Sequence, residues 1–397
     1  MNPYRIPFNK PFIIGRELDY IREAILRGHI AGNGEFTRKC QSLLEEKFDC
    51  KKVLLTTSGT AALEMAALLC DVQQGDEVIL PSFTFVSTAN AFCLRGAKLK
   101  FVDINPHTLN IDEKQLQAAM GASTKIIVPV HYAGVSCEMN TIVEIAKKQG
   151  LYVVEDVAQG VSSKYEDKFL GTIGDLGAFS FHETKNFICG EGGALCINKE
   201  QFIERAEIIW EKGTNRSQFF KGTVDKYTWV DIGSSFLPAD IVAAFLYAQL
   251  EHMDEINKKR KQIFDYYYDS LFLLAQKGCI TLPMCSQDRV NNNHMFYLIL
   301  KSEKMRTSLI EHLKMKGIMA VFHYMPLHLS KVGVAMGYGK GDFPVTEMIS
   351  KTILRLPFYY ELSLEEQKSV IQEIYTFLGC KDIFKATNVI HDERIKV

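Results

Sequence analysis

The sequence predicts an α/β protein with a large domain, built on a mostly parallel central sheet flanked by helices, and a smaller C-terminal α+β domain. Three observations predict this fold class. Short β-branched runs alternate with amphipathic segments between about residues 50 and 200, these runs are apolar at successive positions, and a helical stretch then leads into a mixed region. We expect the large domain over residues 1–236, a long linking helix over 237–276, the small domain over 277–380 and a tail over 381–397.

Six runs in the first half of the chain have the composition of buried strands. Runs such as Ile126–Val130 and Leu151–Val154 are apolar at successive positions, as expected when helices cover both faces of a parallel sheet. The predicted strands are Lys52–Thr57, Glu77–Phe83, Leu99–Ile104, Lys125–Tyr132, Leu151–Val157 and Gly177–Phe181.

The pattern becomes helical from Leu237, after which apolar residues recur at helical spacing. A closing helix begins at Ser363, because Glu366 three residues later completes a capping box. Between these two helices the predicted elements are a strand over His294–Leu300, a helix over Met305–Lys316 and a strand over Ile318–Tyr324. The tail after residue 380 has no convincing periodicity.

The composition excludes several classes of partner. The 397 residues contain 46 Lys plus Arg and 47 Asp plus Glu, so a formal net charge of -1 gives no electrostatic reason to expect nucleic acid or an anionic membrane. No stretch has the length and apolarity of a signal peptide or a membrane span. The ten cysteines form no CxxC pair or Cys/His cluster, so we expect reduced thiols, no metal site and a cytoplasmic location.

The turn Ser58-Gly59-Thr60 joins the first strand to an alanine-rich helix. Free N–H groups at a helix N-terminus, the helix dipole and side-chain hydroxyls together suit a phosphate. An ordinary N-cap explains the same residues, and for this turn taken alone it is the better interpretation.

Glu155 and Asp156 follow an apolar strand whose C-terminal end should open toward the ligand crevice of an α/β sheet. An acid at that point can face a ligand. A cap on the following turn explains Asp156 equally well when this residue is considered by itself.

Lys185 lies between an apolar strand and the glycine-rich turn Gly190–Gly193. Partial desolvation there lowers the pKa of an amine and makes the neutral nucleophile accessible. In isolation, however, a solvated loop lysine is the commoner interpretation, and the nearby His182 would more often be structural.

These three features occur in one order along the chain: a phosphate cradle, an aspartate at a strand end and a lysine. On that order the sequence resembles the fold-type I pyridoxal-phosphate (PLP) enzymes, and specifically the sugar-nucleotide aminotransferases of the DegT/StrS type. The resemblance runs from Pro7 to about Gly379 and includes Ser58–Leu63, Pro81–Phe85, Pro129–Gly134, Glu155–Gln159, Ser180–His182, Lys185–Asn186, Ala243–Ala244, Gln249–Leu250, Tyr324–His328 and Leu356–Pro357.

The resemblance implies pyridoxal 5'-phosphate as the cofactor and assigns a role to each residue that matches. Lys185 would hold PLP as a Schiff base and shuttle the proton, and Asp156 would pair with the pyridinium nitrogen. The other implied cofactor-binding residues are Gln159 beside the ring, Phe85 stacked on the ring, and Ser58, Gly59, Thr60 and Ser180 around the phosphate.

One segment departs from the family pattern. The family commonly has Gly-x-Asn-Tyr-Arg before the long helix, and its asparagine reaches the phosphate of the neighbouring subunit's cofactor. This chain has Ser235 at the asparagine position and Leu237 at the arginine position. The resemblance therefore implies a homodimer with a shared active site, in which Ser235 substitutes through its hydroxyl and the arginine role is absent.

Within the family, Lys212–Phe220, Lys226–Trp229 and Phe322–His328 are similar to the dTDP-4-amino-4,6-dideoxygalactose transaminase group. This likeness implies amino transfer from L-glutamate to C4 of dTDP-4-dehydro-6-deoxyglucose, for a cell-envelope polysaccharide. Arg216 and His323 are then expected to contact the nucleotide-sugar substrate, although a surface ion pair and a packed histidine explain them equally well.

Lys185 favours transamination over the family's dehydratases, in which a histidine replaces the lysine. Two alternatives stay open. The substrate can be another dTDP- or UDP-linked keto sugar, aminated at C3 or C4, or the chain can be a regulatory member of the fold without catalytic activity.

Overall fold

The computed structural model describes residues 4–285 and 289–380, and the chain divides into two compact units. The larger unit consists of residues 13–253 together with the later segment up to Asn292. The described parts of the smaller unit are residues 4–12, 254–285 and 293–380.

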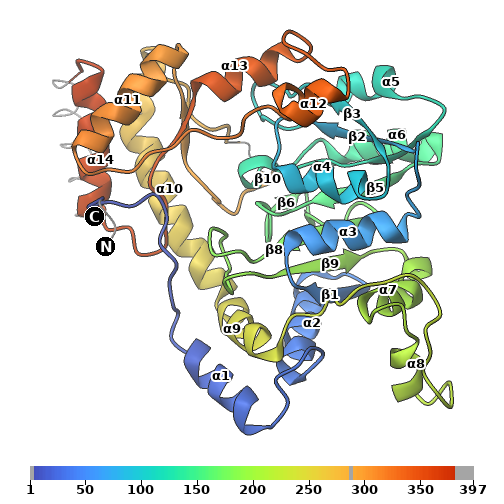
Figure 1. The fold of residues 1–397 in the computed structure, drawn as a ribbon. Coiled ribbons are helices and arrows are strands. Elements are labelled where there is room, and N and C mark those ends of the chain that lie inside the picture. The colour runs from blue at the N-terminus through green and yellow to red at the C-terminus, as the bar shows by residue number, and fades with distance from the viewer. Residues whose placement is uncertain (1–3, 286–288, 381–397) are drawn as a thin grey trace. The chain divides into compact units, whose positions relative to one another are not determined.

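A seven-stranded sheet forms the centre of the larger unit (Figure 1). Its strands are β1 (Lys52–Thr56), β2 (Glu77–Pro81), β3 (Lys98–Val102), β4 (Thr124–Ile127), β5 (Tyr152–Asp156), β8 (Leu176–Ser180) and β9 (Gly193–Ile197). The spatial order is β1-β9-β8-β5-β4-β2-β3, with parallel pairing from β8 through to β3. Only β9 pairs antiparallel with both its neighbours. The predicted mostly parallel sheet is confirmed.

Helices flank this sheet because its central strands are apolar on both sides. The helix α3 packs on β8 and β9, while α6 packs on β4 and β5. One part of the core joins Ile79, Val102, Ile127 and Val153 from four adjacent strands. The helices of this unit are α1 (Glu17–Leu26), α2 (Glu35–Phe48), α3 (Gly59–Leu69), α4 (Val86–Cys93), α5 (Leu116–Ala119), α6 (Met139–Gln149), α7 (Ile203–Trp210), α8 (Arg216–Phe220) and α9 (Asp240–Glu251).

A three-stranded sheet, in the order β10-β6-β7, completes the larger unit. Its strands are β6 (Lys164–Tyr165), β7 (Lys168–Phe169) and β10 (Arg289–Val290). The last of these belongs to a short segment that returns to the larger unit late in the chain.

The smaller unit packs helices around an antiparallel pair of strands, β11 (Tyr297–Ile299) and β12 (Ile353–Arg355). In its core the ring of Phe296 lies 5.0 Å from that of Phe264 and 5.1 Å from that of Tyr267. Ser363 caps the final helix, and both hydrogen bonds of the predicted capping box with Glu366 are present. The helices are α10 (Met253–Gln276), α11 (Glu303–Met315), α12 (Lys331–Ala335), α13 (Pro344–Thr352) and α14 (Leu364–Phe377).

The structure differs from the sequence-based expectations in three places. Two successive helices, α9 and α10, replace the single helix expected over 237–276, because the backbone at His252 leaves helical geometry with φ -105° and ψ 18°. The strand expected over Ile318–Tyr324 forms only isolated bridges, from Ile318 to Ile6 and from Val321 to Arg355. Residues 4–12 group with the smaller unit, and 289–292 with the larger one. The predicted tail, 381–397, lies outside the described residues.

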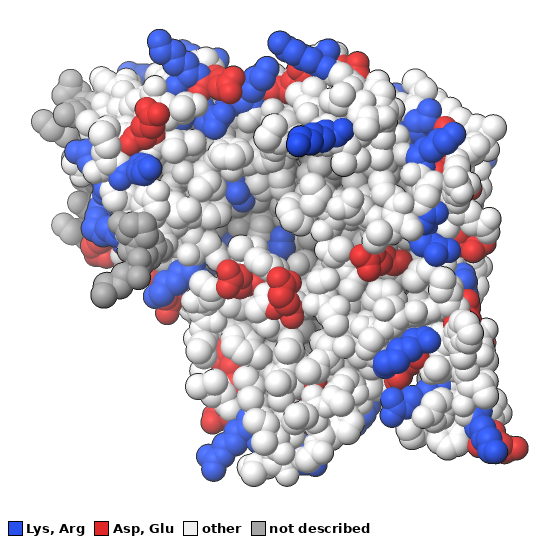
Figure 2. Space-filling view, viewed as in Figure 1, with Lys and Arg blue, Asp and Glu red and all other residues white. Residues whose placement is uncertain are grey.

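No helix in the described ranges is both long enough and apolar enough to cross a membrane. On the face shown in Figure 2, basic and acidic side chains are interspersed over the surface. This distribution agrees with the nearly balanced charge of the sequence.

Candidate active site

Asp156 lies at the carboxyl end of β5, beside the parallel strand β8, where it is in register with Ala178. Its side chain is buried, with 6% of the residue exposed. Oδ1 accepts a hydrogen bond from the N–H of Ala158 at 3.0 Å, and Oδ2 accepts one from the hydroxyl of Thr88 at 2.7 Å. The capping interaction is therefore present, yet the carboxylate keeps acceptor capacity for a ligand, since its two oxygens together offer about four lone-pair sites.

The predicted phosphate cradle is the first turn of α3. Ser58 is the N-cap, and its hydroxyl accepts a hydrogen bond from the N–H of Ala61 at 3.0 Å. A Cβ on Gly59 would lie 2.9 Å from the Cβ of Ser180, so only glycine allows the start of α3 to approach the end of β8 this closely. The N–H groups of Gly59 and Thr60 lie in the first turn, where no intrahelical acceptor is available.

The glycine-rich turn after Lys185 also packs tightly. A Cβ on Gly193 would lie 2.4 Å from the carbonyl carbon of Ser58 and 2.5 Å from the nitrogen of Gly59. The end of this turn therefore packs closely against the backbone at the start of α3.

The first turn of α4 connects the cradle to Asp156. Phe85 is the N-cap residue of this helix, and 56% of it is exposed. Ser87 accepts a hydrogen bond from the hydroxyl of Thr60 at 2.7 Å, while Thr88 donates to Asp156. The sequence analysis missed Ser87 and Thr88, although two adjacent hydroxyl residues in the first turn of a helix were the available signal.

Lys185 lies in the loop between β8 and β9 and is half-buried. Its backbone N–H donates to the carbonyl of His182 at 2.9 Å, which shapes a tight turn. The adjacent Asn186 is buried. Burial, with a contribution from the charge of Glu191, raises the pKa of the Cys189 thiol to about 12, so this neighbour stays protonated and is not a competing nucleophile.

Gln159 follows Asp156 by three residues and is likewise buried. Its side-chain Oε1 accepts a hydrogen bond from the N–H of Ala133 at 2.7 Å. The structure thus places Asp156 at the end of β5 and Gln159 in the loop that follows, with Thr60 joined to the same region through α4.

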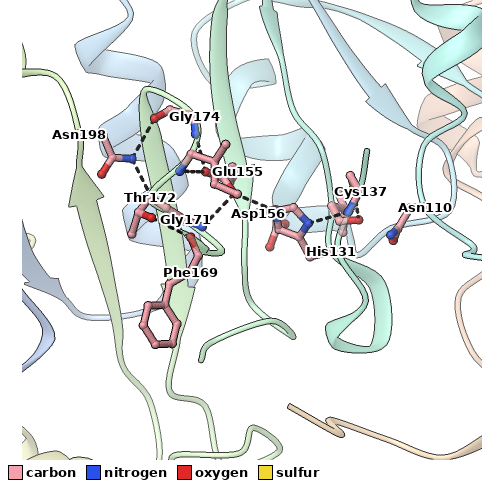
Figure 3. Close-up of polar contacts among 12 residues, drawn as sticks. Asn110, His131, Cys137, Glu155, Asp156, Phe169, Gly171, Thr172, Gly174 and Asn198 are labelled. Atoms are coloured by element: carbon pink, nitrogen blue, oxygen red, sulfur yellow. Dashed lines mark hydrogen bonds and ion pairs between the residues drawn. The ribbon is translucent and has the colours of Figure 1, made fainter. Parts of the chain in front are cut away.

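Glu155, next to Asp156, has a different environment (Figure 3). It is fully buried and accepts four hydrogen bonds, from the N–H groups of Gly171, Ile173 and Gly174 at 2.6–2.8 Å and from Nε2 of His131 at 3.0 Å. Because Nδ1 of His131 accepts a hydrogen bond from the N–H of Cys137 at 3.1 Å, the ring carries its proton on Nε2. Glu155 and His131 therefore hold loops beside the site in place.

Arg216 and Ser235 have polar or backbone contacts elsewhere in the larger unit. Nη1 of Arg216 lies 3.5 Å from the carboxylate of Glu211, and the guanidinium lies over the ring of Phe220 at 5.2 Å. Ser235 is exposed and forms an isolated antiparallel bridge with Glu211. The ion pair is the alternative that the sequence left open for Arg216, and a substrate contact for it stays a prediction.

His323 belongs to the smaller unit. It is buried, and its ring stacks on that of Tyr324 with centroids 3.6 Å apart. This is the packing expected of a structural histidine, and its contact with a substrate stays a prediction.

The groups of the larger unit fit pyridoxal phosphate. Backbone N–H groups and the hydroxyls of Thr60 and Ser180 suit a phosphate, and the close approach at Gly59 leaves room only for backbone there. The buried carboxylate of Asp156 suits a protonated ring nitrogen, and Lys185 supplies an amine on a neighbouring loop.

Comparisons with known proteins agree with this fit. Residues 12–375 match the model of the DegT/DnrJ/EryC1/StrS aminotransferase family. Among curated relatives, the spore coat polysaccharide biosynthesis protein SpsC of Bacillus subtilis is 31% identical, over 93% of this chain and 96% of its own length. GDP-perosamine synthase of Escherichia coli O157:H7 is 30% identical, over 95% of this chain and 99% of its own.

A solved structure shares the fold. The putative sugar aminotransferase Spr1654 from Streptococcus pneumoniae, in its PMP form, superposes with a TM-score of 0.88 at 25% identity, over 94% of this chain and 99% of its own. The same protein has also been solved in a PLP form, with a TM-score of 0.86. From the family match, the relatives and the geometry of the site, we conclude that this chain belongs to the DegT/DnrJ/EryC1/StrS aminotransferase family and that its cofactor is pyridoxal phosphate.

Proposed function

We propose that this protein transfers the amino group of L-glutamate to C4 of a nucleotide-linked 4-keto-6-deoxy sugar. The proposed substrate is dTDP-4-dehydro-6-deoxy-D-glucose, and the product is dTDP-4-amino-4,6-dideoxy-D-galactose. The observation that supports catalysis most strongly is that one unit contains the amine of Lys185, the buried carboxylate of Asp156 and a glycine-based cradle at the start of α3.

Bound PLP supplies an electron-poor ring that accepts the electrons of a carbanion. Asp156 keeps the ring nitrogen protonated, because a carboxylate close to that nitrogen favours its charged form. Nζ of Lys185 would hold the cofactor and would then act as the base that moves a proton at the reacting carbon of the substrate. The same lysine therefore serves both halves of the reaction.

A second candidate keeps this chemistry and changes the nucleotide. GDP-perosamine synthase is 30% identical over 95% of this chain, which supports a GDP-linked keto sugar as the alternative acceptor. The name of SpsC, a spore coat polysaccharide biosynthesis protein, supports a role in making sugars for a surface polysaccharide under either candidate.

We also propose that the active enzyme is a homodimer in which Ser235 reaches the cofactor of the neighbouring subunit. On the short helix α1, three large apolar side chains are exposed together, Leu18 at 66%, Ile25 at 56% and Leu26 at 76%. A group of exposed apolar side chains is typical of a surface that another chain covers. Light scattering of the holoenzyme should give twice the monomer mass, and a monomer would contradict this proposal.

The substrate proposal is tested with a panel of dTDP-, GDP- and UDP-linked keto sugars and L-glutamate. We expect conversion of the dTDP 4-keto-6-deoxy sugar, with the configuration at C4 of the product read by NMR. The matched controls are Lys185→Ala, expected to be inactive, and Lys148→Ala, which removes an exposed lysine of α6 and should be active.

Conversion of the GDP sugar alone would favour the second candidate. A wild-type protein that converts no sugar and shows no visible absorption band with PLP would contradict an enzymatic function altogether and favour a regulatory role.

A further inference from the structure

Asn292 lies at the end of the short segment that returns to the larger unit, and only 3% of it is exposed. Its side-chain Nδ2 donates hydrogen bonds to the backbone carbonyls of Gln159 and Val161, each at 2.9 Å. Its backbone carbonyl accepts a hydrogen bond from Nδ2 of Asn186 at 2.8 Å. One residue therefore joins the loop after β5, which carries Gln159, to the loop that carries Lys185.

The two hydrogen bonds that Nδ2 donates fix the orientation of the side-chain amide of Asn292. Its two N–H groups both point at carbonyls, so Oδ1 must face the other way, toward Gly134, where a Cβ would lie only 2.1 Å from it. Within the described chain this buried oxygen has no hydrogen-bond partner. Such an arrangement is unfavourable for stability and calls for a reason beyond packing.

The backbone beside Oδ1 is unusual as well. Ala133 and Gly134 are both left-handed, with φ of 56° and 83°. This geometry points the N–H of Ala133 at Oε1 of Gln159, at 2.7 Å. Gln159 is consequently held at two points: its side chain by Ala133 and its backbone carbonyl by Asn292.

The segment that carries Asn292 is fixed independently of these bonds. Arg289 donates to the carbonyl of Ser136 at 2.8 Å and forms an ion pair with Glu138. The backbone N–H of Asn292 donates to the hydroxyl of Ser163 at 3.0 Å. Asn292 is therefore a fixed point from which two loops of the site are positioned.

We infer that Asn292 is a positioning residue that sets Lys185 and Gln159 relative to each other, an inference that rests on the proposed role of Lys185. Asn186 directly follows Lys185, so its bond to Asn292 limits where the lysine backbone can move. Without the two donated bonds, the carbonyls of Gln159 and Val161 are no longer held to the segment that Asn186 binds. A displacement of about 1 Å between groups that must meet during a reaction costs on the order of 100-fold in rate.

The chain offers a closely matched control in Asn198. Its Nδ2 also donates to two backbone carbonyls, those of Gly171 and Gly174, each at 2.9 Å (Figure 3). These bonds hold the loop that Glu155 also binds. Replacing either asparagine with alanine removes two bonds from an amide N–H to a backbone carbonyl, and at Asn198 it also removes the bond that Oδ1 accepts from the Cys196 thiol at 3.3 Å. Asn292, unlike Asn198, is bonded to the neighbour of Lys185.

The experiment compares holoenzymes of Asn292→Ala and Asn198→Ala with wild type. We expect Asn292→Ala to lower the kcat of the reaction with L-glutamate by about 10- to 100-fold, with KM changed far less, because positioning acts on the reaction rather than on binding. The pH midpoint of the visible band of lysine-bound PLP should also shift, since the protonation of Nζ depends on its surroundings. Asn198→Ala should lower the melting temperature of the apoprotein and leave both the midpoint and kcat at wild-type values.

A second variant guards against a failure of Asn292→Ala to fold. Asn186→Ala cuts the same connection on the lysine side without altering Asn292, and we expect it to shift the midpoint in the same direction. If the Asn292 and Asn186 variants match Asn198→Ala in kcat and midpoint, the inference is wrong. If wild type has no visible band that Lys185→Ala removes, the proposed function has failed instead.

Discussion

Two adjacent carboxylates on β5, Glu155 and Asp156, have opposite environments. Successive side chains of a strand point to opposite faces of the sheet. Glu155 therefore contacts the loop at Gly171–Gly174, whereas Asp156 contacts Thr88 in the first turn of α4. Glu155 is fully buried and accepts four hydrogen bonds, whereas Asp156 accepts two. A carboxylate offers about four acceptor sites, so Glu155 is saturated by the protein and Asp156 is not.

This difference supports the proposal that Glu155 is a structural acid and that Asp156 binds the cofactor. Both residues are acids at the end of the same strand, and the sequence Glu-Asp alone does not say which of them faces the cofactor. The smaller number of hydrogen bonds that Asp156 accepts favours Asp156 for this role. The following predictions test this contrast, from the largest expected effect to the smallest.

Asp156→Asn should have the largest effect on the reaction. The amide fills the same space but carries no charge to stabilise a protonated ring nitrogen, so the rate of the reaction with L-glutamate should fall about 10²- to 10³-fold. The change in the visible spectrum on mixing with glutamate measures this rate without requiring the sugar substrate. A rate within about threefold of wild type would break the contrast between the two acids.

Glu155→Gln should act on stability. The NH₂ group of the glutamine would face backbone N–H groups that donate to a carboxylate oxygen in the wild type. We therefore expect the free energy of unfolding to fall by about 3 kcal/mol. Urea denaturation of the apoprotein measures the loss, and the folded fraction should react with glutamate at nearly the wild-type rate. Unchanged stability with a lost rate would assign the catalytic role to Glu155.

Thr88→Val should lower the rate of the reaction with glutamate about 10-fold. The substitution preserves the shape of the side chain but removes the charge-assisted hydrogen bond that orients Asp156. Thr37→Val is the matched control. Thr37 is also buried and donates its hydroxyl to a buried carboxylate, that of Asp240, at 2.8 Å. The control should lose stability at unchanged rate, and equal rates for the two variants would refute a role for Thr88 at the site.

Ser58→Ala should have the smallest effect. Removing the N-cap of α3 costs about 1 kcal/mol of stability and weakens PLP binding at the same turn. Ser363→Ala removes the N-cap of α14 in the smaller unit and should cost about as much stability without changing the Kd for PLP. Equal PLP affinity in both variants would show that Ser58 only caps its helix.

Most strands of the larger unit could be predicted from the sequence because the patterns that specify them are local. The apolar runs became strands β1 to β5 and β8, and the signature at Ser363 became a capped helix. The prediction of a strand over Ile318–Tyr324 was wrong for a nonlocal reason. A segment of strand-like composition forms no ladder when other segments pair with it only at isolated bridges.

The candidate site was predictable only in part, for the same physical reason. Lys185 and Asp156 belong to local motifs, and their order along the chain connected them. Thr88 and Asn292 act through contacts across 68 and 133 residues of chain, which no local pattern contains. The turn at Ser58 becomes a candidate phosphate site because Gly59 lies close to Ser180, and this contact also exists only in the folded chain.

The central claim is that Lys185 carries the cofactor, and one measurement tests it directly. Borohydride reduces the bond between a lysine and PLP to a stable amine, so the reduced holoenzyme can be digested and its peptides mapped by mass. We predict one phosphopyridoxyl group for each chain, on Lys185. A label on any other lysine, or none in a protein that binds PLP, would contradict this account.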